Sequence, residues 1–357
     1  MRICFISHGQ LIHIDAYLDF FKTRGDDVHF ISLTPSPPKQ VPTYNMGFGK
    51  YTVKKGKWKY LLSAMRIRRL VRKLKPDIVH AHYATSGGLA GLVCGFHPFV
   101  VTVHGSDLTL GIKSRIWKPL LKAIFNHADC VNTVSEDLKE MALTLGISAE
   151  KIKVITPGID TENFSFVEKG PIDEEQPLRL ICTRRLEPVF NHQTIIEALA
   201  TLKSKGVRFH MTLVGDGTLK EKLEQLVREK QLAGQVTFLG QLDNSKLPQV
   251  LQQNDVYLSA SLWDGTSLSL LEAMATGLFP VVSDIKANKA WLKNNVNGLL
   301  HRVTDAEDLA DKILRLRGNP KLTIQAAKTN RRLVVTSGDR KTNLKQVEKI
   351  YEQLCRN

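Results

Sequence analysis

Short hydrophobic runs separated by longer segments of mixed polarity recur along the whole chain of 357 residues. In the first half these runs are residues 3–6, 28–33, 78–79, 99–103, 130–133 and 152–155, and in the second half 178–183, 209–214, 236–239, 256–258 and 280–283. Continuous apolar runs of this length are typical of strands buried on both faces, and the segments between them have helix-like patterns. The pattern predicts an α/β protein with two doubly wound parallel sheets in tandem, each covered by helices on both faces.

Ligands of such sheets bind beyond the carboxyl ends of the strands, so the residues that directly follow each run are candidate site residues. His104 and Asp107 follow one run of the first half, and Gly9 follows the first run, where it would allow close approach to a ligand. An imidazole can hold or move a proton near neutral pH. In the second half the corresponding positions are Arg184, Arg185, Gly215 and Gly240. A guanidinium such as that of Arg185 can bind two oxygens of a diphosphate at once.

Residues 254–277 predict a buried strand, a polar loop and a helix that begins after Thr266 or Ser267 and ends at Gly277. The first backbone N–H groups of a helix have no partner within the helix, so this helix could cradle a phosphate without a metal ion. Asp264 and Glu272 would flank that phosphate, and their carboxylates are better suited to accept hydrogen bonds from sugar hydroxyls. An ordinary strand–loop–helix connection with solvated acids is the alternative.

The segment 264–275, D-G-T-S-L-S-L-L-E-A-M-A, resembles the E-G-F-G-x-x-x-x-E-A-M-A signature of retaining glycosyltransferases of family four, the group 1 glycosyltransferases. His104-Gly-Ser-Asp107 is similar to the H-G-x-D segment of that family, and residues 155–164 are similar to its P-x-G-[VI]-D-x-x-x-F passage out of the first domain. The segment 184–191 resembles the G-R-L-x-x-x-K-G turn, with Arg184 at the first glycine and Phe190 at the lysine that would hold the diphosphate.

The resemblance implies a B-type glycosyltransferase fold, with two Rossmann-like domains facing across a cleft. It implies transfer of a sugar from a UDP- or GDP-sugar to a hydroxyl group with retained anomeric configuration. Glu272 would hold the nucleotide ribose and Asp264 would meet the donor sugar. The implied catalytic residues are His104, Arg185 and Asp264; the donor site comprises Gly9, Arg184, Gly215, Gly240, Ser267, Leu268 and Glu272; Asp107 lies on the acceptor side.

No cofactor and no metal ion is expected, because the chain has neither a D-x-D sequence nor a Cys/His metal-binding spacing. Positive charge for the leaving diphosphate would come from Arg185, from Arg184 and from the start of the helix. The competing functions are a sugar-nucleotide epimerase of similar fold and a non-catalytic partner subunit that binds a membrane or nucleic acid.

Domain boundaries are predicted at an acidic stretch that contains Gly170 and Pro171. We expect an N-terminal acceptor domain at 1–167, a linker at 168–176, a nucleotide-sugar domain at 177–335 and a C-terminal helix at 336–357 that crosses back to the first domain.

The formal net charge is +15, and residues 28–76 contain twelve Lys or Arg residues and no Asp or Glu. Within them a basic amphipathic helix is predicted near 57–75, with Arg66, Arg68, Arg69 and Arg72 on its polar side. An anionic membrane surface is the preferred partner of this helix, ahead of a merely solvated face, and no nucleic-acid partner is expected.

The remaining composition is that of an ordinary globular protein, with 43% hydrophobic and 24% charged residues. Five scattered cysteines without a C-x-x-C pair are typical of reduced thiols. A strand at the very start and the absence of an export signal predict a cytoplasmic protein, peripheral on the inner face of the membrane. The expected acceptor is a glycan or a lipid-linked sugar of cell-envelope polysaccharide, lipopolysaccharide or glycolipid synthesis.

Overall fold

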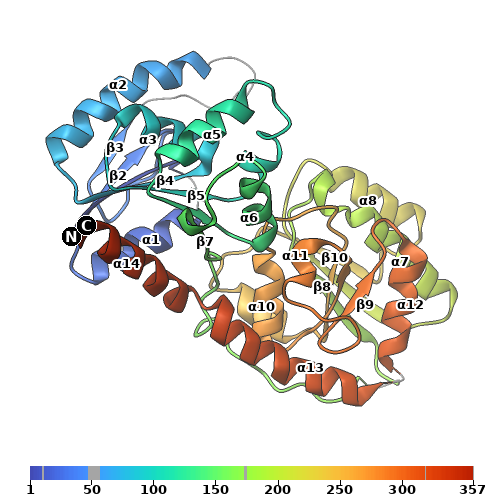
Figure 1. Cartoon of the computed structure of the whole chain (residues 1–357). Coiled ribbons are helices and arrows are strands. Elements are labelled where there is room, and N and C mark those ends of the chain that lie inside the picture. The colour runs from blue at the N-terminus through green and yellow to red at the C-terminus, as the bar shows by residue number, and fades with distance from the viewer. Residues whose placement is uncertain (10–11, 47–56, 173–174, 318, 357) are drawn as a thin grey trace. The chain divides into compact units, whose positions relative to one another are not determined.

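The computed structural model describes residues 1–9, 12–46, 57–172, 175–317 and 319–356. The chain forms two compact units (Figure 1). Unit 1 comprises Met1–Pro157 and Lys341–Asn357, and unit 2 comprises Gly158–Arg340. Each unit has its own parallel sheet, which confirms the predicted fold class of two parallel-sheet α/β domains.

Unit 1 contains a seven-stranded sheet in the order β3-β2-β1-β4-β5-β6-β7, and neighbouring strands are parallel. The strands are β1 (Arg2–Ser7), β2 (Asp27–Ser32), β3 (Thr43–Asn45), β4 (Ile78–His82), β5 (Phe99–Val103), β6 (Cys130–Thr133) and β7 (Ile152–Val154). Six of them match the predicted hydrophobic runs. The short edge strand β3 was not predicted, because its sequence Thr-Tyr-Asn has no hydrophobic run.

The two faces of this sheet are covered by different helices, because alternate residues of a strand point to opposite faces. Cys4 and Ile6 belong to a core shared with α2 (Lys57–Leu74), α3 (Leu89–Cys94), α5 (Trp117–His127) and α6 (Glu136–Leu143). Ile3 and Phe5 belong to a core shared with α1 (Ile12–Thr23) and α14 (Arg340–Arg356).

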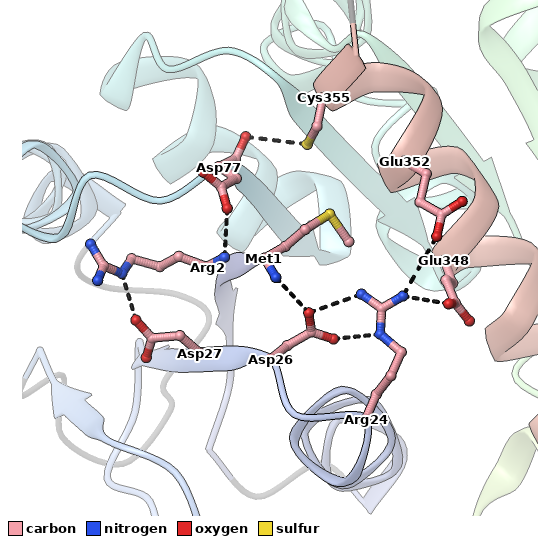
Figure 2. Close-up of polar contacts among 9 residues, drawn as sticks. All are labelled: Met1, Arg2, Arg24, Asp26, Asp27, Asp77, Glu348, Glu352 and Cys355. Atoms are coloured by element: carbon pink, nitrogen blue, oxygen red, sulfur yellow. Dashed lines mark hydrogen bonds and ion pairs between the residues drawn. The ribbon is translucent and has the colours of Figure 1, made fainter.

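Helix α14 is tied to the beginning of the chain by polar contacts as well as by that core (Figure 2). The guanidinium of Arg24 pairs with Glu348 and with Asp26, and Asp26 also accepts a hydrogen bond from the amino group of Met1 at 2.7 Å. The C-terminal helix therefore belongs structurally to unit 1.

Unit 2 contains a six-stranded parallel sheet in the order β10-β9-β8-β11-β12-β13. The strands are β8 (Leu178–Cys182), β9 (Phe209–Val214), β10 (Val236–Gly240), β11 (Val256–Ser259), β12 (Phe279–Ser283) and β13 (Leu299–His301). One core lies under α7 (His192–Ser204), α8 (Lys220–Glu229) and α12 (Ala306–Arg317). A second core lies under α9 (Leu247–Gln252) and α10 (Leu268–Thr276), and α13 (Pro320–Leu333) precedes α14.

The units divide after Pro157, upstream of the linker predicted at 168–176. Ile159 and Phe164 are buried in the core of unit 2, so the segment after Pro157 already packs as part of that unit. Residues 173–174 of the predicted linker lie outside the described residues. Ile159 also pairs with the far end of unit 2, since its N–H donates to the carbonyl of Gly338 at 2.9 Å and its carbonyl accepts from Arg340 N–H at 2.8 Å.

Candidate active site

Each sheet has one point where the strand order reverses, and these points locate the candidate sites. In unit 2 the strands β8 and β11 are neighbours, and the chain then builds β9 and β10 on one side and β12 and β13 on the other. In unit 1 the corresponding neighbours are β1 and β4. The loops that leave two such strands diverge, which opens a ligand site beyond their carboxyl ends.

Helix α10 begins at the switch point of unit 2 and confirms the predicted strand–loop–helix segment. Ser267 is the N-cap, and its hydroxyl accepts a hydrogen bond from the N–H of Leu270 at 3.3 Å. Leu268 is the first helical residue. Gly277 ends the helix in the left-handed conformation, with φ 93°. The free N–H groups of the first turn and the helix dipole make this end suitable for a phosphate.

Arg184 joins the loop after β8 to the start of α10. The residue is 9% exposed, and its guanidinium pairs with the Asp264 carboxylate. Its Nη1 donates to the hydroxyl of Ser269 at 2.9 Å and to that of Ser267 at 3.3 Å. The arginine therefore holds the first acid of the motif against the N-terminus of α10.

Phe190 occupies the position of the lysine in the family turn and stacks on Arg184. The centre of its ring lies 4.1 Å from the guanidinium carbon. A cation over an aromatic face is attracted by the electron-rich ring. The aromatic side chain thus supports the buried arginine. The lysine's positive charge is absent at this position.

Arg185 faces solvent. Its side chain is 74% exposed and lies 3.4 Å from the carboxylate of Glu187, which is itself bound by the hydroxyl of Thr218 at 2.7 Å. An exposed guanidinium with one loose ion pair is free to bind a ligand phosphate at low cost. Its predicted diphosphate role stays a prediction.

Glu272 lies on the second turn of α10 and is partly buried. Burial raises the pKa of its carboxyl group to about 7, against the opposing effects of Arg340 and Arg184. A carboxyl group with this pKa changes charge near neutral pH.

The glycines predicted in the donor site shape the loops around Arg184. Gly215 has φ 139°, and a Cβ atom there would lie 2.5 Å from the carbonyl oxygen of Arg184. Its N–H donates to the carbonyl of Gly240 at 2.8 Å. The loops after β8, β9 and β10 are therefore in direct contact, and only glycine fits at position 215.

At the switch point of unit 1, Gly9 is needed for packing between loops. A Cβ atom at Gly9 would lie 2.4 Å from that of Ser36, and its N–H donates to the hydroxyl of Thr34 at 3.0 Å. Its neighbour His8 approaches the hydroxyl of Ser86 with Nε2 at 2.9 Å, and burial lowers the pKa of His8 to about 4. The close approach here is to protein atoms, and a role of Gly9 toward the donor stays a prediction.

Asp107 is 4% exposed and shapes the turn that carries His104. Its carboxylate accepts from the N–H groups of Ala84 at 2.8 Å, Gly105 at 2.8 Å and His104 at 3.2 Å. Gly105 has φ 132°, a conformation that favours glycine. The contacts of Asp107 are those of a loop-bracing residue, and its predicted role on the acceptor side is untested.

His104 belongs to a row of histidines that sequence reasoning did not connect. Its Nε2 lies 3.1 Å from Nδ1 of His82, and the rings of His82 and His80 stack at 4.3 Å. His80 in turn contacts the hydroxyls of Thr102, at 2.7 Å, and of Tyr351. The sequence His-Ala-His in β4 could have predicted that His80 and His82 lie side by side, because residues two apart in a strand share a face.

Among the described residues, no group of three or more His, Cys, Asp or Glu side chains is placed to hold a metal ion. Within the same part of the chain, none of the helices combines the length and the hydrophobicity needed to cross a membrane.

Comparison with known proteins places this geometry in a family. The family model described as glycosyltransferase family 4 matches residues 8–163, and the model described as glycosyl transferases group 1 matches residues 164–333. The amylovoran biosynthesis glycosyltransferase AmsK of Erwinia amylovora is 27% identical over 78% of this chain and 70% of its own. The UDP-Gal:alpha-D-GlcNAc-diphosphoundecaprenol alpha-1,3-galactosyltransferase of Escherichia coli is 28% identical over 77% of this chain and 75% of its own.

Solved structures agree on the fold. Sucrose-phosphate synthase from Thermosynechococcus elongatus superposes with a TM-score of 0.84 at 21% identity, covering 99% of this chain and 98% of that one. HepE from Anabaena, solved in complex with UDP-glucose, superposes with a TM-score of 0.79 at 19% identity, covering 99% of this chain and 100% of that one. With both halves of the chain matched by glycosyltransferase models, the protein belongs to the group 1 glycosyltransferases.

Proposed function

We propose that the protein transfers a sugar from a UDP-sugar to a hydroxyl group of a glycan or lipid-linked acceptor in cell-envelope polysaccharide, lipopolysaccharide or glycolipid synthesis. The observation that carries the proposal is the start of α10, where the buried Arg184 pairs with Asp264 and contacts the N-cap Ser267, and Glu272 follows on the second turn of the helix. The N-terminus of a helix is suited to bind a phosphate. The two curated relatives support a role in polysaccharide assembly, and the name of one specifies UDP-Gal as its donor. HepE supports the same nucleotide, since it was solved with UDP-glucose bound.

Protection against thermal unfolding tests the donor. A ligand that binds only the folded protein stabilises it by about 2.7 kcal/mol at a hundred times its dissociation constant. We expect one or more UDP-sugars to raise the melting temperature and GDP-sugars to raise it less. The Glu272→Gln variant should lose most of this shift, whereas Glu221→Gln on the exposed surface of α8 should keep it. Equal protection of the two variants would contradict the assignment of Glu272.

We also propose that transfer proceeds with retention and without a metal ion. The exposed guanidinium of Arg185 and the N-terminus of α10 would supply positive charge to the leaving diphosphate. This supply of charge supports transfer without a metal ion. Turnover should survive EDTA, and Arg185→Ala should lower kcat by about a hundredfold. The anomeric coupling constant of the product, measured by NMR, decides retention. Loss of activity in EDTA with recovery in magnesium would contradict metal independence.

The partner proposed for α2 is an anionic membrane surface. Arg66, Arg69 and Arg72 are exposed on this helix, Arg68 is half-buried, and Ile67 and Val71 point into the core. Exposed positive charges attract anionic lipids, and each Lys or Arg near the surface contributes about 1 kcal/mol. The attraction acts over a range of about 10 Å at 0.1 M salt. The side chains of this helix before Met65 lie outside the described residues.

Vesicle co-sedimentation tests this partner. The Arg66/Arg69/Arg72→Ser variant should bind anionic vesicles much more weakly at low salt. The matched variant Lys222/Arg228/Lys230→Ser removes the same charge from exposed positions of unit 2 and should bind like the unchanged protein. Equal loss in both variants would show a nonspecific effect of net charge.

A further inference from the structure

The three most exposed large hydrophobic side chains of the described chain lie in unit 1. Ile116 is 73% exposed, Leu110 is 70% exposed and Met65 is 51% exposed. Leu110 and Ile116 are the first and last residues of the connection between α4 (Ser106–Thr109) and α5, and Met65 lies on α2. Exposed apolar side chains of this size carry information when they gather on one part of a surface.

The connection between α4 and α5 is held in shape from the inside. Leu108 and Leu121 at its ends are buried, and a Cβ atom at Gly111 would lie 2.5 Å from the carbonyl of Asp107 and 2.6 Å from Leu121. The N–H of Ser114 donates to the carbonyl of Gly111 at 3.0 Å. Leu110 and Ile116 are thus presented to solvent by a connection whose other apolar residues are packed.

The connection and the helix α5 that follows it are rich in positive charge. Residues 108–128 contain Lys113, Arg115, Lys118 and Lys122 and no Asp or Glu, and all four basic residues are exposed. Helix α3 packs against both α5 and α2, so the three helices form one layer on one face of the sheet (Figure 1). Apolar tips among basic side chains are the arrangement by which proteins enter the interface of an anionic bilayer.

We propose that residues 110–116 form an anchor whose Leu110 and Ile116 side chains insert into the apolar boundary of an anionic bilayer, while the surrounding lysines and arginines bind the headgroups. The inference rests on the membrane partner of the proposed function and adds an apolar contact to it. The anchor begins three residues after Asp107, so it would hold the His104 turn beside the bilayer surface. A lipid-linked acceptor could then present its sugar to unit 1 without leaving the membrane.

High salt distinguishes membrane binding through this apolar anchor from binding through the charges of α2. Raising the salt to about 0.5 M shortens electrostatic attraction and leaves apolar insertion in place. At this salt the full chain should retain measurable partition into vesicles of phosphatidylglycerol and phosphatidylcholine. The Leu110→Ser/Ile116→Ser variant should lower the partition coefficient by at least about tenfold. The control Leu143→Ser/Val296→Ser, which changes exposed hydrophobic residues elsewhere, should leave it unchanged.

A fluorescent probe locates the contact directly. Cys355 is the exposed cysteine of the described chain, so Cys355→Ser provides a background in which Ile116→Cys can be labelled selectively with an environment-sensitive dye. Brominated lipids should quench the dye at position 116 and should not quench it at the control position Leu143→Cys. Absence of quenching at 116, or unchanged high-salt partition of the Leu110→Ser/Ile116→Ser variant, would overturn the proposal and leave these residues as a docking surface for protein.

Thermal protection by UDP-sugars, measured on every variant without vesicles, reports the donor site separately. Thermal protection by UDP-sugars without quenching of the dye at position 116 would contradict the proposed anchor and leave the donor assignment unaffected. Quenching without protection would defeat the donor assignment and leave the anchor in place.

Discussion

Arg184 and Phe190 change the chemistry of the donor loop together. The family turn has glycine and lysine at these positions, and this chain has a buried guanidinium that is stacked on an aromatic ring and paired with Asp264. Removal of one partner from a buried ion pair is costly, because the remaining charge stays desolvated. The two departures from the family turn are therefore expected to depend on each other.

Exchange of the two residues tests this dependence. Arg184→Gly alone should lower kcat/KM by about a hundredfold or more, because Asp264 and the start of α10 lose their common donor. Phe190→Lys alone should also lower it, because a second cation would be placed against Arg184. The double variant Arg184→Gly/Phe190→Lys should recover part of the loss, as coupled sites are not additive. Losses that simply add in kcat/KM would show that the two positions act independently.

Glu272 should make donor binding depend on pH. Its pKa of about 7 lies above the ordinary value, so the carboxyl group is mostly neutral below pH 7 and ionised above it. Ribose hydroxyls donate hydrogen bonds more strongly to the ionised form. Affinity for a UDP-sugar measured by calorimetry should rise by about tenfold between pH 6 and pH 8. Glu272→Gln should abolish this rise. A rise that persists in the variant would assign it to another group.

The same shift has the opposite sign for stability. A carboxyl group whose pKa is raised by folding favours the folded state at low pH, and this contribution disappears as the pH rises from about 4.5 through about 7. Tight donor binding above pH 7 thus comes with a less stable free protein. Such a cost is common where a charged group is kept in a site for its function.

Local signals predicted some of these residues and not others. Ser267 and Gly277 were predictable because a cap and a stop depend on neighbouring residues in the sequence. The Arg184–Asp264 pair joins residues eighty positions apart, so it required the sheet order that brings β8 beside β11. The H-G-x-D motif likewise identifies Asp107 as a candidate site residue, but its hydrogen bonds from the N–H groups of Ala84 and Gly105 could be seen only in the fold.

At the scale of elements, α14 completes one face of the unit 1 sheet. Tyr351 is fully buried, its ring stacks on Phe21 with centres 5.0 Å apart, and its hydroxyl bonds to His80. His80 stacks on His82, which contacts His104. A helix from the end of the chain therefore supports the histidine row that leads to a candidate catalytic residue.

Substitutions in α14 should separate packing from hydrogen bonding. Tyr351→Ala should lower the free energy of unfolding by about 3–5 kcal/mol, because a large buried side chain is lost. Tyr351→Phe should lower it by about 1–2 kcal/mol, because a polar partner of His80 is lost while the ring remains. Lys349→Ala on the exposed side of the helix should change it by less than about 0.5 kcal/mol. Urea denaturation measures all three, and equal effects of Ala and Phe would contradict the packing role of the ring.

Element prediction succeeded where a single feature decided the structure. Short apolar runs predicted six strands of unit 1, and central strands such as β5 and β6 are buried along their whole length, as expected for parallel strands covered on both faces. Strand β3 was not predicted, because its three residues form a strand through pairing with β2 and not through a hydrophobic run of their own. The two compact units divide after Pro157, whereas the linker is predicted at 168–176. The glycine and the acids of 168–176 are typical of a loop, while the burial of Ile159 shows that the chain already packs in unit 2 before that loop.

On the scale of the whole molecule, unit 2 is an insertion within unit 1. The chain leaves unit 1 at Pro157 and returns at Lys341. Both ends of unit 2 are paired through Ile159 and Asp339, and both ends of the gap in unit 1 are joined by the side chain of Asn343, which donates to the carbonyl of Thr156 at 3.1 Å. Each unit is therefore closed on itself, with its own buried cores.

This connectivity predicts which fragments fold. Residues 158–340 should unfold cooperatively on heating when expressed alone, because two cores and both paired ends lie within them. Residues 1–157 alone should fold poorly, because without α14 the face that contains Phe21 is uncovered. Joining Pro157 to Lys341 through a short Gly-Ser linker should restore a cooperative transition, since Asn343 already brings these ends together. Circular dichroism during heating measures each case. A fragment 1–157 as stable as the linked form would show that α14 is dispensable for unit 1, and the support it gives to His80 and His104 would then have to come from the sheet alone.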